Sequence, residues 1–428
     1  MSSSRFPASG EDRGRAGLQV GTLDSLLDSD DISRRRRIPL GLAALGLGAL
    51  IWLPCVHLFF QPDDSVDRAR ALAAHQLRLW QDPAARAVEI GKLRGSNAEW
   101  DFMARTYLVL ALSNLALSEP AAGRERRLAQ IDRIIDETLR LEREEGLYFF
   151  LMSYARDRPF VVQPPRSLFL DGEIALMLGA RCMVKSRPAY RALLRERVAA
   201  MTSRMRAGPV RCAESYPDEC WTFCNTVALA AIRIADVLDG TDHGALLAEW
   251  VRTARQRLVD RGTGLLISSF HLSGARRDGP EGSSIWMAAH CLQLVDPTFA
   301  RDQYRRARAE LGRSILGFGY AREWPRSSVG PVDIDSGPVV PLLEASPASS
   351  GLALIAAAAF GDATFYDQLR ASLDFAAFPI ERDGRLRYAA SNQVGDAVML
   401  YAMTLRRGPT LWGEAARRGS GPGREGAR

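Results

Sequence analysis

Six segments of the chain are apolar or small almost all round the helical turn, and they constrain the fold more than any other feature. A helix without a polar stripe needs cover on every side, so each segment is expected to lie inside the protein. The polar residues that lead into these segments lie near Trp100, Asp171, Trp221, Gly282, Ser350 and Asn392, at intervals of 42 to 71 residues. Such intervals accommodate two helices and their connections.

Amphipathic segments alternate with the apolar ones. The clearest runs from Tyr190 to Met205, where apolar residues follow three- and four-residue steps with arginines between them. The alternation predicts an all-α fold, an (α/α)6 toroid of helical hairpins in which each inner helix except the last is followed by an outer helix. An irregular α-solenoid, with half-exposed inner helices along a groove, is the alternative.

Residues 38–60, IPLGLAALGLGALIWLPCVHLFF, contain no charge and are long enough to cross a hydrocarbon core of about 30 Å. Four arginines precede the segment and QPDDSVD follows it, which places the N-terminus in the cytoplasm. A cleaved signal peptide is the rival interpretation, but the preceding leader is long and FFQPDD offers no small-residue cleavage site. We therefore predict a single transmembrane helix in the cell membrane, with the lipid bilayer as partner and an exterior (periplasmic or extracellular) C-terminal domain.

The predicted order is a disordered cytoplasmic leader (1–37), the transmembrane helix (38–60), the exterior barrel domain (61–412) and a disordered tail (413–428). The net charge of +6 derives largely from the arginines of the leader and tail. The folded middle is therefore nearly neutral, which argues against nucleic acid as a partner. The sequence leaves open whether the protein is a monomer or a homo-oligomer.

If the inner helices run parallel, their N-terminal ends share one face, where unpaired N–H groups and positive dipole ends gather. The segments before these helices are polar, and they supply candidates for a site at this face. Candidate catalytic residues are Asp171, Glu219, Cys220, Cys224, His271 and Asp335. Candidate substrate-binding residues are Tyr216, Trp221, Phe223, Asn225, Trp286 and Tyr320. Simple helix capping is the alternative for carboxylates such as Asp171.

Three cysteines, Cys212, Cys220 and Cys224, cluster before the third apolar segment. Outside the cell such cysteines are expected to form a disulfide, with Cys212 pairing with either of the others and one thiol left over. A free thiol at a helix N-terminus is expected to have a lowered pKa, and Glu219 is near enough in sequence to exchange a proton with it. Without a nearby histidine or fourth thiol, the cluster does not predict zinc. We expect no metal and no cofactor.

The stretch from Cys212 to Asn225, with Glu219-Cys220-Trp221-Thr222-Phe223-Cys224-Asn225 opening an Ala-rich inner helix, resembles the linalool dehydratase/isomerase family. In that family a Cys-Glu pair precedes a second cysteine that is followed by asparagine. Cys224 matches the second cysteine, and either Cys212 or Cys220 stands for the first. Glu219 precedes Cys220 instead of following it, which departs from the family pattern.

The resemblance implies an (α/α)6 barrel with its active site at the inner-helix mouths and cofactor-free acid–base chemistry on small isoprenoid alcohols. We therefore expect an anchored, exterior-facing lyase or isomerase that acts on a small, apolar alcohol. Two alternatives stay open. One is a six-hairpin glycoside hydrolase with a carboxylate pair drawn from Asp171, Glu219 and Asp335. The other is a non-catalytic envelope binding or scaffold module whose cysteines form disulfides.

Overall fold

The computed structural model describes residues 24–60, 65–328, 330–331, 336–406 and 408–419. The chain divides into two compact units, Met1–Gln61 and Pro62–Arg428. The described part of the first unit is α1 (Asp24–Trp52) followed by the 3-10 helix η1 (Leu53–Phe60). Within it, residues 38–60 are long and apolar enough to cross a membrane, and none of their side chains is buried.

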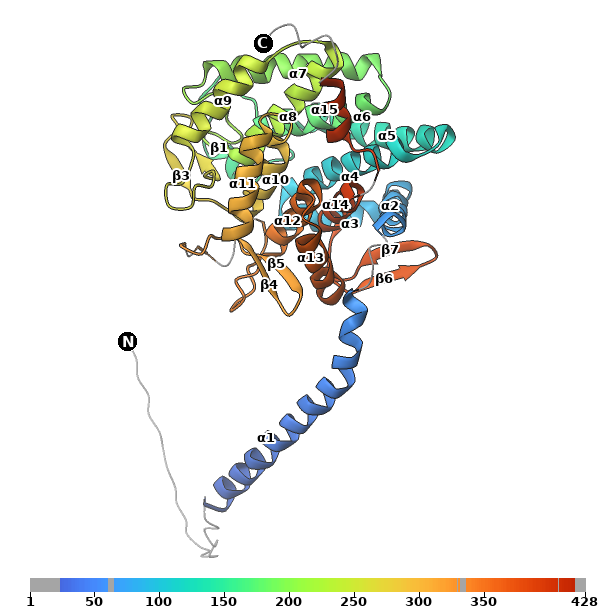
Figure 1. The fold of residues 1–428 in the computed structure, drawn as a ribbon, viewed down its shortest axis with the longest axis vertical. Coiled ribbons are helices and arrows are strands. Elements are labelled where there is room, and N and C mark those ends of the chain that lie inside the picture. The colour runs from blue at the N-terminus through green and yellow to red at the C-terminus, as the bar shows by residue number, and fades with distance from the viewer. Residues whose placement is uncertain (1–23, 61–64, 329, 332–335, 407, 420–428) are drawn as a thin grey trace, which may run out of the picture. The chain divides into compact units, whose positions relative to one another are not determined.

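The second unit is a closed ring of six inner helices, which confirms the predicted toroid (Figure 1). The inner helices are α4 (Ala98–Ser118), α6 (Leu168–Val184), α8 (Thr222–Asp239), α10 (Gly282–Leu292), α12 (Pro347–Phe360) and α14 (Gln393–Arg406). Each packs against the next, and α14 packs back against α4 to close the ring.

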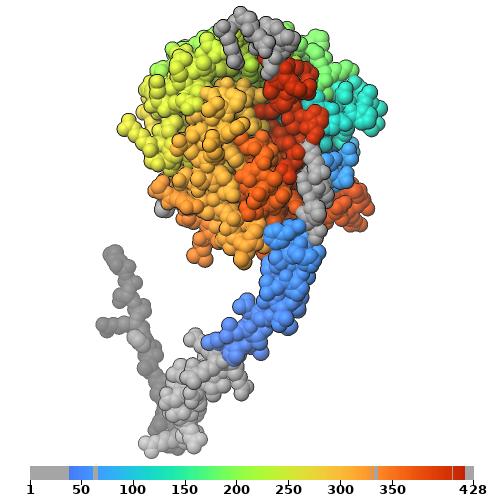
Figure 2. All heavy atoms as spheres, viewed as in Figure 1, coloured from blue at the N-terminus to red at the C-terminus, as the bar shows by residue number. Residues whose placement is uncertain are grey.

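Outer helices cover this ring. Five of them follow an inner helix: α5 (Ala121–Glu145), α7 (Pro188–Ala207), α9 (Gly244–Arg257), α11 (Pro297–Glu310) and α13 (Ala363–Ala376). The remaining position is filled from the N-terminal side by α2 (Ser65–Gln81), which contacts α14, and α3 (Pro83–Ser96), which contacts α4. In the space-filling view, side chains fill the spaces between these helices over the face shown (Figure 2).

The burial of each helix follows its sequence pattern. Every residue of α6 from Leu168 to Met183 is buried, as expected for a helix without a polar face. In α5, by contrast, the buried side chains include Leu128, Ile131 and Ile135, which recur at helical spacing. The two kinds of helix therefore occupy the inner and outer layers as predicted.

Short antiparallel strands lie in the connections that lead from an outer helix to the next inner helix. They are β1 (Cys220–Trp221), β2 (Ser269–Phe270), β3 (Arg276–Asp278), β4 (Gly312–Ile315), β5 (Phe318–Ala321), β6 (Pro379–Arg382) and β7 (Arg385–Tyr388). The first three form one sheet, while β4–β5 and β6–β7 are two hairpins. These strands therefore surround the end of the ring where the inner helices begin. We call this end the mouth. A 3-10 turn, η2 (Ser153–Arg156), lies in the connection between α5 and α6.

A last helix, α15 (Leu411–Gly419), lies across the opposite end of the ring and contacts α4, α6 and α8. The backbone N–H of Leu411 donates to Asn114 Oδ1 at 2.9 Å. Trp412 donates from its indole nitrogen to the carbonyl of His290 at 3.2 Å, and the two rings stack with centroids 4.4 Å apart. Trp412 thereby fills the end of the ring that lies away from the mouth.

The structure corrects both predicted disordered ends. Residues 413–419 belong to α15, where Ala415 is buried, although the composition of this segment had suggested a tail. At the other end, α1 begins at Asp24, so residues 24–37 of the predicted leader are helical. The rest of the predicted leader (1–23) and of the predicted tail (420–428) lies outside the described residues.

We predict that Trp412→Ala lowers the free energy of unfolding by about 3 to 5 kcal/mol, because it removes a buried aromatic side chain and leaves a cavity. The measurement is chemical denaturation of the full chain in detergent. Arg417→Ala, on an exposed position of the same helix, is the control and should change stability by less than about 0.5 kcal/mol. Equal effects of the two substitutions would show that α15 does not stabilise the ring.

Candidate active site

A cavity of about 1240 Å³ lies at the mouth. Its wall is formed by the first turns of several inner helices and by the connections that precede them. The apolar wall includes Trp100, Met103, Phe169, Trp221, Phe223, Trp324, Leu352, Val398 and Met399. The carboxyl, thiol and guanidinium groups in the wall belong to Glu99, Glu219, Cys224, Arg277, Asp278, Glu281 and Glu323. The cavity thus combines an apolar interior with several ionisable side chains.

Backbone pairing with a distant segment fixes the start of α8 beside this cavity. Strand β1 pairs with β2, and the N–H of Thr222 donates to the carbonyl of Ser268 at 2.9 Å. Asn225 ties the preceding loop to the helix, since its amide oxygen accepts from Ala213 N at 3.2 Å and its amide nitrogen donates to Trp221 O at 2.9 Å. Asn225 therefore has a structural role and does not line the cavity.

Strand alternation decides which side chains of this stretch face the cavity. Glu219 and Trp221 lie in the wall, while Cys220 between them points into the core and is fully buried. The indole nitrogen of Trp221 donates to Glu219 Oε1 at 2.9 Å, and Arg277 Nη1 lies 2.5 Å from Glu219 Oε2. Glu219 is thus a buried carboxylate held between an indole N–H and a guanidinium.

Cys224 lies in the first turn of α8 and in the cavity wall. Burial raises the pKa of its thiol well above the ordinary value, and the nearby carboxylates of Glu99 and Glu173 add to this effect. The prediction of a lowered thiol pKa was therefore wrong, because desolvation of the thiolate outweighs the favourable helix end. At neutral pH Cys224 carries a proton and offers a weak S–H donor.

Glu99 lies in the first turn of α4 and accepts a hydrogen bond from the hydroxyl of Tyr216. The Tyr216 oxygen also accepts from the backbone N–H of Met152 at 3.0 Å, and its ring stacks on Tyr154 at 4.7 Å. Burial and the neighbouring Glu99 carboxylate raise the pKa of Tyr216. Tyr216 therefore stays protonated and holds Glu99 in place at the mouth.

Glu323 is a buried wall residue that the sequence analysis missed. Its carboxylate accepts from the backbone N–H of Ser283 at 3.0 Å, from the Ser283 hydroxyl at 2.5 Å and from the Ser346 hydroxyl at 2.7 Å. Burial nevertheless raises its pKa. Glu323 follows β5 and does not directly precede an inner helix, so a search restricted to helix starts could not find it.

Glu173 is a buried carboxyl near Cys224 that the sequence analysis did not select, and it is not among the wall residues of the cavity. It is buried in α6, and burial raises its pKa to about 7, although the nearby Thr106 hydroxyl opposes the shift. The sequence analysis chose Asp171 from the same first turns. Residues two apart in a helix point in widely different directions, and the spacing from Phe169, a wall residue, would have indicated Glu173 instead.

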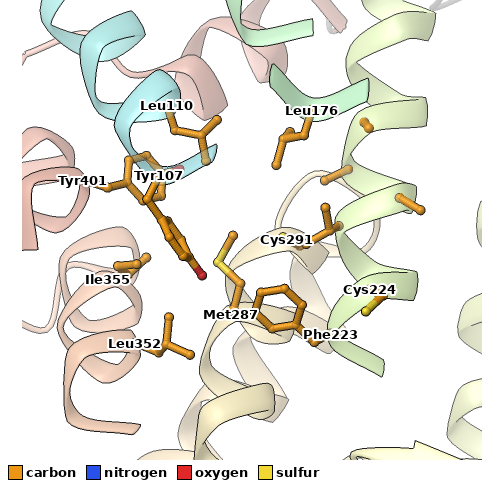
Figure 3. Close-up of a cluster of buried hydrophobic side chains, with 14 of the residues drawn as sticks. Tyr107, Leu110, Leu176, Phe223, Cys224, Met287, Cys291, Leu352, Ile355 and Tyr401 are labelled. Atoms are coloured by element: carbon orange, nitrogen blue, oxygen red, sulfur yellow. The ribbon is translucent and has the colours of Figure 1, made fainter. Parts of the chain in front are cut away.

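The barrel interior near Glu173 is apolar. Figure 3 shows Tyr107, Phe223 and Met287 reaching toward one another from α4, α8 and α10. The Tyr107 hydroxyl is buried and has no hydrogen-bond partner among the residues that the structure describes. Burial and the Glu173 carboxyl raise the pKa of Tyr107. The floor of the mouth is thus a low-dielectric region in which charge is unfavourable.

The structure divides the predicted site residues into two groups. The wall contains Tyr216, Glu219, Trp221, Phe223, Cys224 and Tyr320. The wall does not contain Asp171, Cys220, Asn225, His271 or Trp286. Asp335 lies outside the described residues.

The residues outside the wall have other partners. Asp171 binds Arg166 at 2.6 Å and Arg197 at 2.7 Å, on the side of α6 that faces α7. His271 is partly exposed and pairs with Asp218 at 2.9 Å. Both were predicted from their place near a helix mouth, which does not determine the direction of a side chain.

All six cysteines carry free thiols, so the structure contains none of the disulfides that the clustered cysteines suggested. Cys212, Cys220 and Cys224 are buried, and burial raises the pKa of the Cys212 thiol to about 12. Within the described parts of the chain, no group of three or more His, Cys, Asp and Glu side chains is arranged to hold a metal ion.

Comparison with known proteins identifies relatives of both the sequence and the fold. A family model described as linalool dehydratase/isomerase matches residues 180–394, about half of the chain. A GH76 alpha-mannanase from Bacteroides thetaiotaomicron is structurally similar, with a TM-score of 0.51 and 10% identity over 85% of this chain and 99% of that chain. An unsaturated glucuronyl hydrolase from Bacillus sp. GL1 has a TM-score of 0.47 and 13% identity over 72% of this chain and 86% of that chain. At 10% identity, the likeness to the mannanase concerns the fold alone.

We predict a pH-dependent stability effect of Glu173→Gln. Because the pKa of Glu173 is raised from 4.5 to about 7, the folded protein keeps a proton that the unfolded chain releases between these values. Wild-type stability therefore falls as pH rises through this window, by up to roughly 3 kcal/mol from this group. Measured at pH 5 and pH 8, the free energy of unfolding of the variant relative to that of the wild type should be higher at pH 8. A difference independent of pH would contradict the assignment.

Proposed function

The chain belongs to the linalool dehydratase/isomerase family, and from this premise we propose that its mouth cavity catalyses acid–base dehydration or isomerisation of a small apolar alcohol without a cofactor. The observation that carries the proposal is that one cavity wall holds two carboxyl groups in different environments. Glu323 is buried with a raised pKa, whereas Glu219 is ion-paired with Arg277. Such a pair can supply an acid and a base in one site.

In the proposed reaction the carboxyl of Glu323 donates a proton to the substrate hydroxyl. The C–O bond breaks, water leaves with the bonding electrons, and a carbocation remains among the apolar side chains. The carboxylate of Glu219 removes a proton from the adjacent carbon, and the electrons of that C–H bond form the C=C bond. Proton return from Glu219 to Glu323 through solvent restores both groups. Isomerisation follows when water adds to another carbon of the same cation and the protonated hydroxyl so formed gives its extra proton to Glu219.

Cys224 has a different proposed role. Its raised pKa makes it a poor proton donor, but its neutral S–H group can donate a weak hydrogen bond to the substrate oxygen. The apolar body of the substrate would lie against Phe223, Met103 and Phe169, which line the same cavity. The thiol then positions the hydroxyl while the carboxyl groups transfer protons.

We predict that the full chain, purified in detergent, converts linalool or a related isoprenoid alcohol to an alkene or an isomer, measured by gas chromatography. Glu323→Gln should lower the rate by about 100-fold or more, since it removes the proton donor. Cys224→Ala should lower it about tenfold, the typical value of one hydrogen bond. Cys220→Ala is the matched control, because this buried thiol lies in β1, directly before the same helix, but does not line the cavity.

Equal loss in the Cys224 and Cys220 variants would contradict the assigned role of Cys224. Full activity of folded Glu323→Gln would contradict the acid–base assignment. Thermal melting of each variant distinguishes loss of the site from loss of the fold.

Glycoside hydrolysis is the second candidate, and a specific feature favours it. Trp100, Trp221 and Trp324 lie in the same wall as Glu219 and Glu281, and aromatic rings beside carboxylates suit a sugar chain. Mannooligosaccharides belong in the same assay for this reason. Release of reducing sugar without conversion of any alcohol would replace the lyase proposal by a hydrolase.

We also propose that residues 38–60 anchor the protein in the cell membrane, with the second unit outside the cytoplasm. Support comes from the exposed, uncharged surface of this helical segment and from the arginines at 34–37 that precede it.

We predict that protease added to intact cells, after removal of any outer barrier, digests the second unit and leaves a membrane-bound fragment that contains residues 38–60. A cytoplasmic marker protein should resist digestion in the same sample. Protection of the second unit until the membrane is dissolved would place it in the cytoplasm and reverse the orientation.

A further inference from the structure

Large apolar side chains are exposed mainly at one end of the second unit. Leu316 is 90% exposed and Leu342 is 100% exposed. We define the rim as Ile315, Leu316, Val340, Leu342, Leu343, Phe375, Phe378 and Ile380. All of these residues lie at or between the ends of outer helices α11 and α13 and the starts of inner helices α12 and α14. The rim is therefore at the mouth, and Figure 1 shows the β4–β5 and β6–β7 hairpins at the same end of this unit.

The rim borders the proposed substrate cavity. Val340 is both an exposed rim residue and part of the cavity wall. Ala376 and Ala377 line the cavity next to the rim residue Phe378, and Tyr320 lines it from β5. The rim and the cavity thus share Val340 and adjoin at Phe378.

Three rim residues adopt a backbone conformation that bulky residues rarely tolerate. The φ angles are +51° at Leu316, +66° at Leu342 and +52° at Phe378. Glycine or asparagine fits this left-handed region better, and these exposed side chains gain little packing in return. In water these residues are therefore unfavourable both in their backbone conformation and in the exposure of their apolar side chains. This indicates that a less polar phase than water covers them.

The connection between the proposed membrane span and the second unit is short. Only residues 61–64 separate Phe60 from Ser65, the start of α2, so these two residues are at most about 18 Å apart. The first turn of α2 lies at the mouth end, because Arg68 donates to the hydroxyl of Tyr388 in β7 at 2.8 Å and pairs with Asp374 at the end of α13. A bilayer crossed by residues 38–60 is therefore within reach of the rim.

We propose that the rim inserts into the outer surface of the lipid bilayer, so that the cavity receives its apolar substrate from the membrane. Arg382, in the β6–β7 hairpin beside the rim, lies 3.8 Å from Asp383, but its side chain is 88% exposed and can also contact an anionic headgroup. The proposal rests on the proposed membrane span but not on the proposed acid–base chemistry. It extends the proposed function by naming a membrane-dissolved alcohol as the substrate class.

The test uses the full chain in vesicles of phosphatidylcholine and phosphatidylglycerol that contain a lipid with a photoreactive diazirine on one acyl chain. After illumination, lipid adducts are mapped by mass spectrometry of proteolytic peptides. We expect adducts on residues 38–60 and, in addition, on peptides that contain Leu316, Leu342 and Phe378. Adducts confined to residues 38–60 would overturn the proposal.

A variant that combines Leu316→Asn, Leu342→Asn and Phe378→Asn tests the rim side chains directly. Asparagine tolerates the left-handed backbone, so the Tm of the variant should equal or exceed that of the wild type. Adducts at the rim should fall at least fivefold while adducts on residues 38–60 stay constant. Unchanged rim labelling in the folded variant would contradict the proposal.

Val88→Gln is the matched control, because Val88 is 59% exposed but lies on α3, away from the rim. It should leave rim labelling unchanged. Loss of rim labelling in this variant would show a general effect of surface polarity and overturn the assignment.

A second copy of the chain is the competing occupant. Rim-to-rim protein cross-links in place of lipid adducts would assign the surface to a dimer and refute membrane insertion. Labelling requires no turnover, so rim adducts on a protein that converts no alcohol would keep this inference while the proposed chemistry fails.

Discussion

The packing of α14 against α4 is the constraint on which the rest of the structure depends, because it closes the ring. Tyr107 and Tyr401 approach with ring centroids 6.1 Å apart, and Asn114 donates to the hydroxyl of Thr404 at 3.1 Å across the same contact. These pairs join residues separated by about 290 positions in sequence. Closure brings the N-terminal ends of the inner helices around one cavity, so every group in the wall owes its neighbours to this contact.

The fold could be predicted from the sequence because a helix that is buried on all sides has no polar face, and this pattern is easy to recognise. Inner helices such as α6 lack a polar face, and their alternation with amphipathic helices predicted both layers. Local signals failed for α15, where only Leu411, Trp412 and Ala415 are buried and glycine and arginine dominate the rest. The hairpins were missed for a related reason, since strands of two to four residues are too short to show alternation.

The site was predictable only where direction was fixed by regular structure. Glu219 and Trp221 were found because the cysteine-rich stretch leads directly into α8. Asp171 was chosen in place of Glu173, although the two side chains point about 200° apart round the helix. Glu323 enters the wall from a connection whose path no sequence pattern specifies. The protonation of Cys224 depends on burial, and burial is a property of the assembled ring.

The cross-wise position of α15 has a consequence for traffic through the ring. Trp412, stacked on His290, fills the end of the ring that lies away from the mouth, so the cavity opens at the mouth. In the proposed reaction, the substrate, its product and the released water would all pass through the mouth. Release of an apolar product would then compete with entry of the next substrate molecule. A hydrophobic phase beside the mouth would take up the product and leave the cavity free for the next substrate.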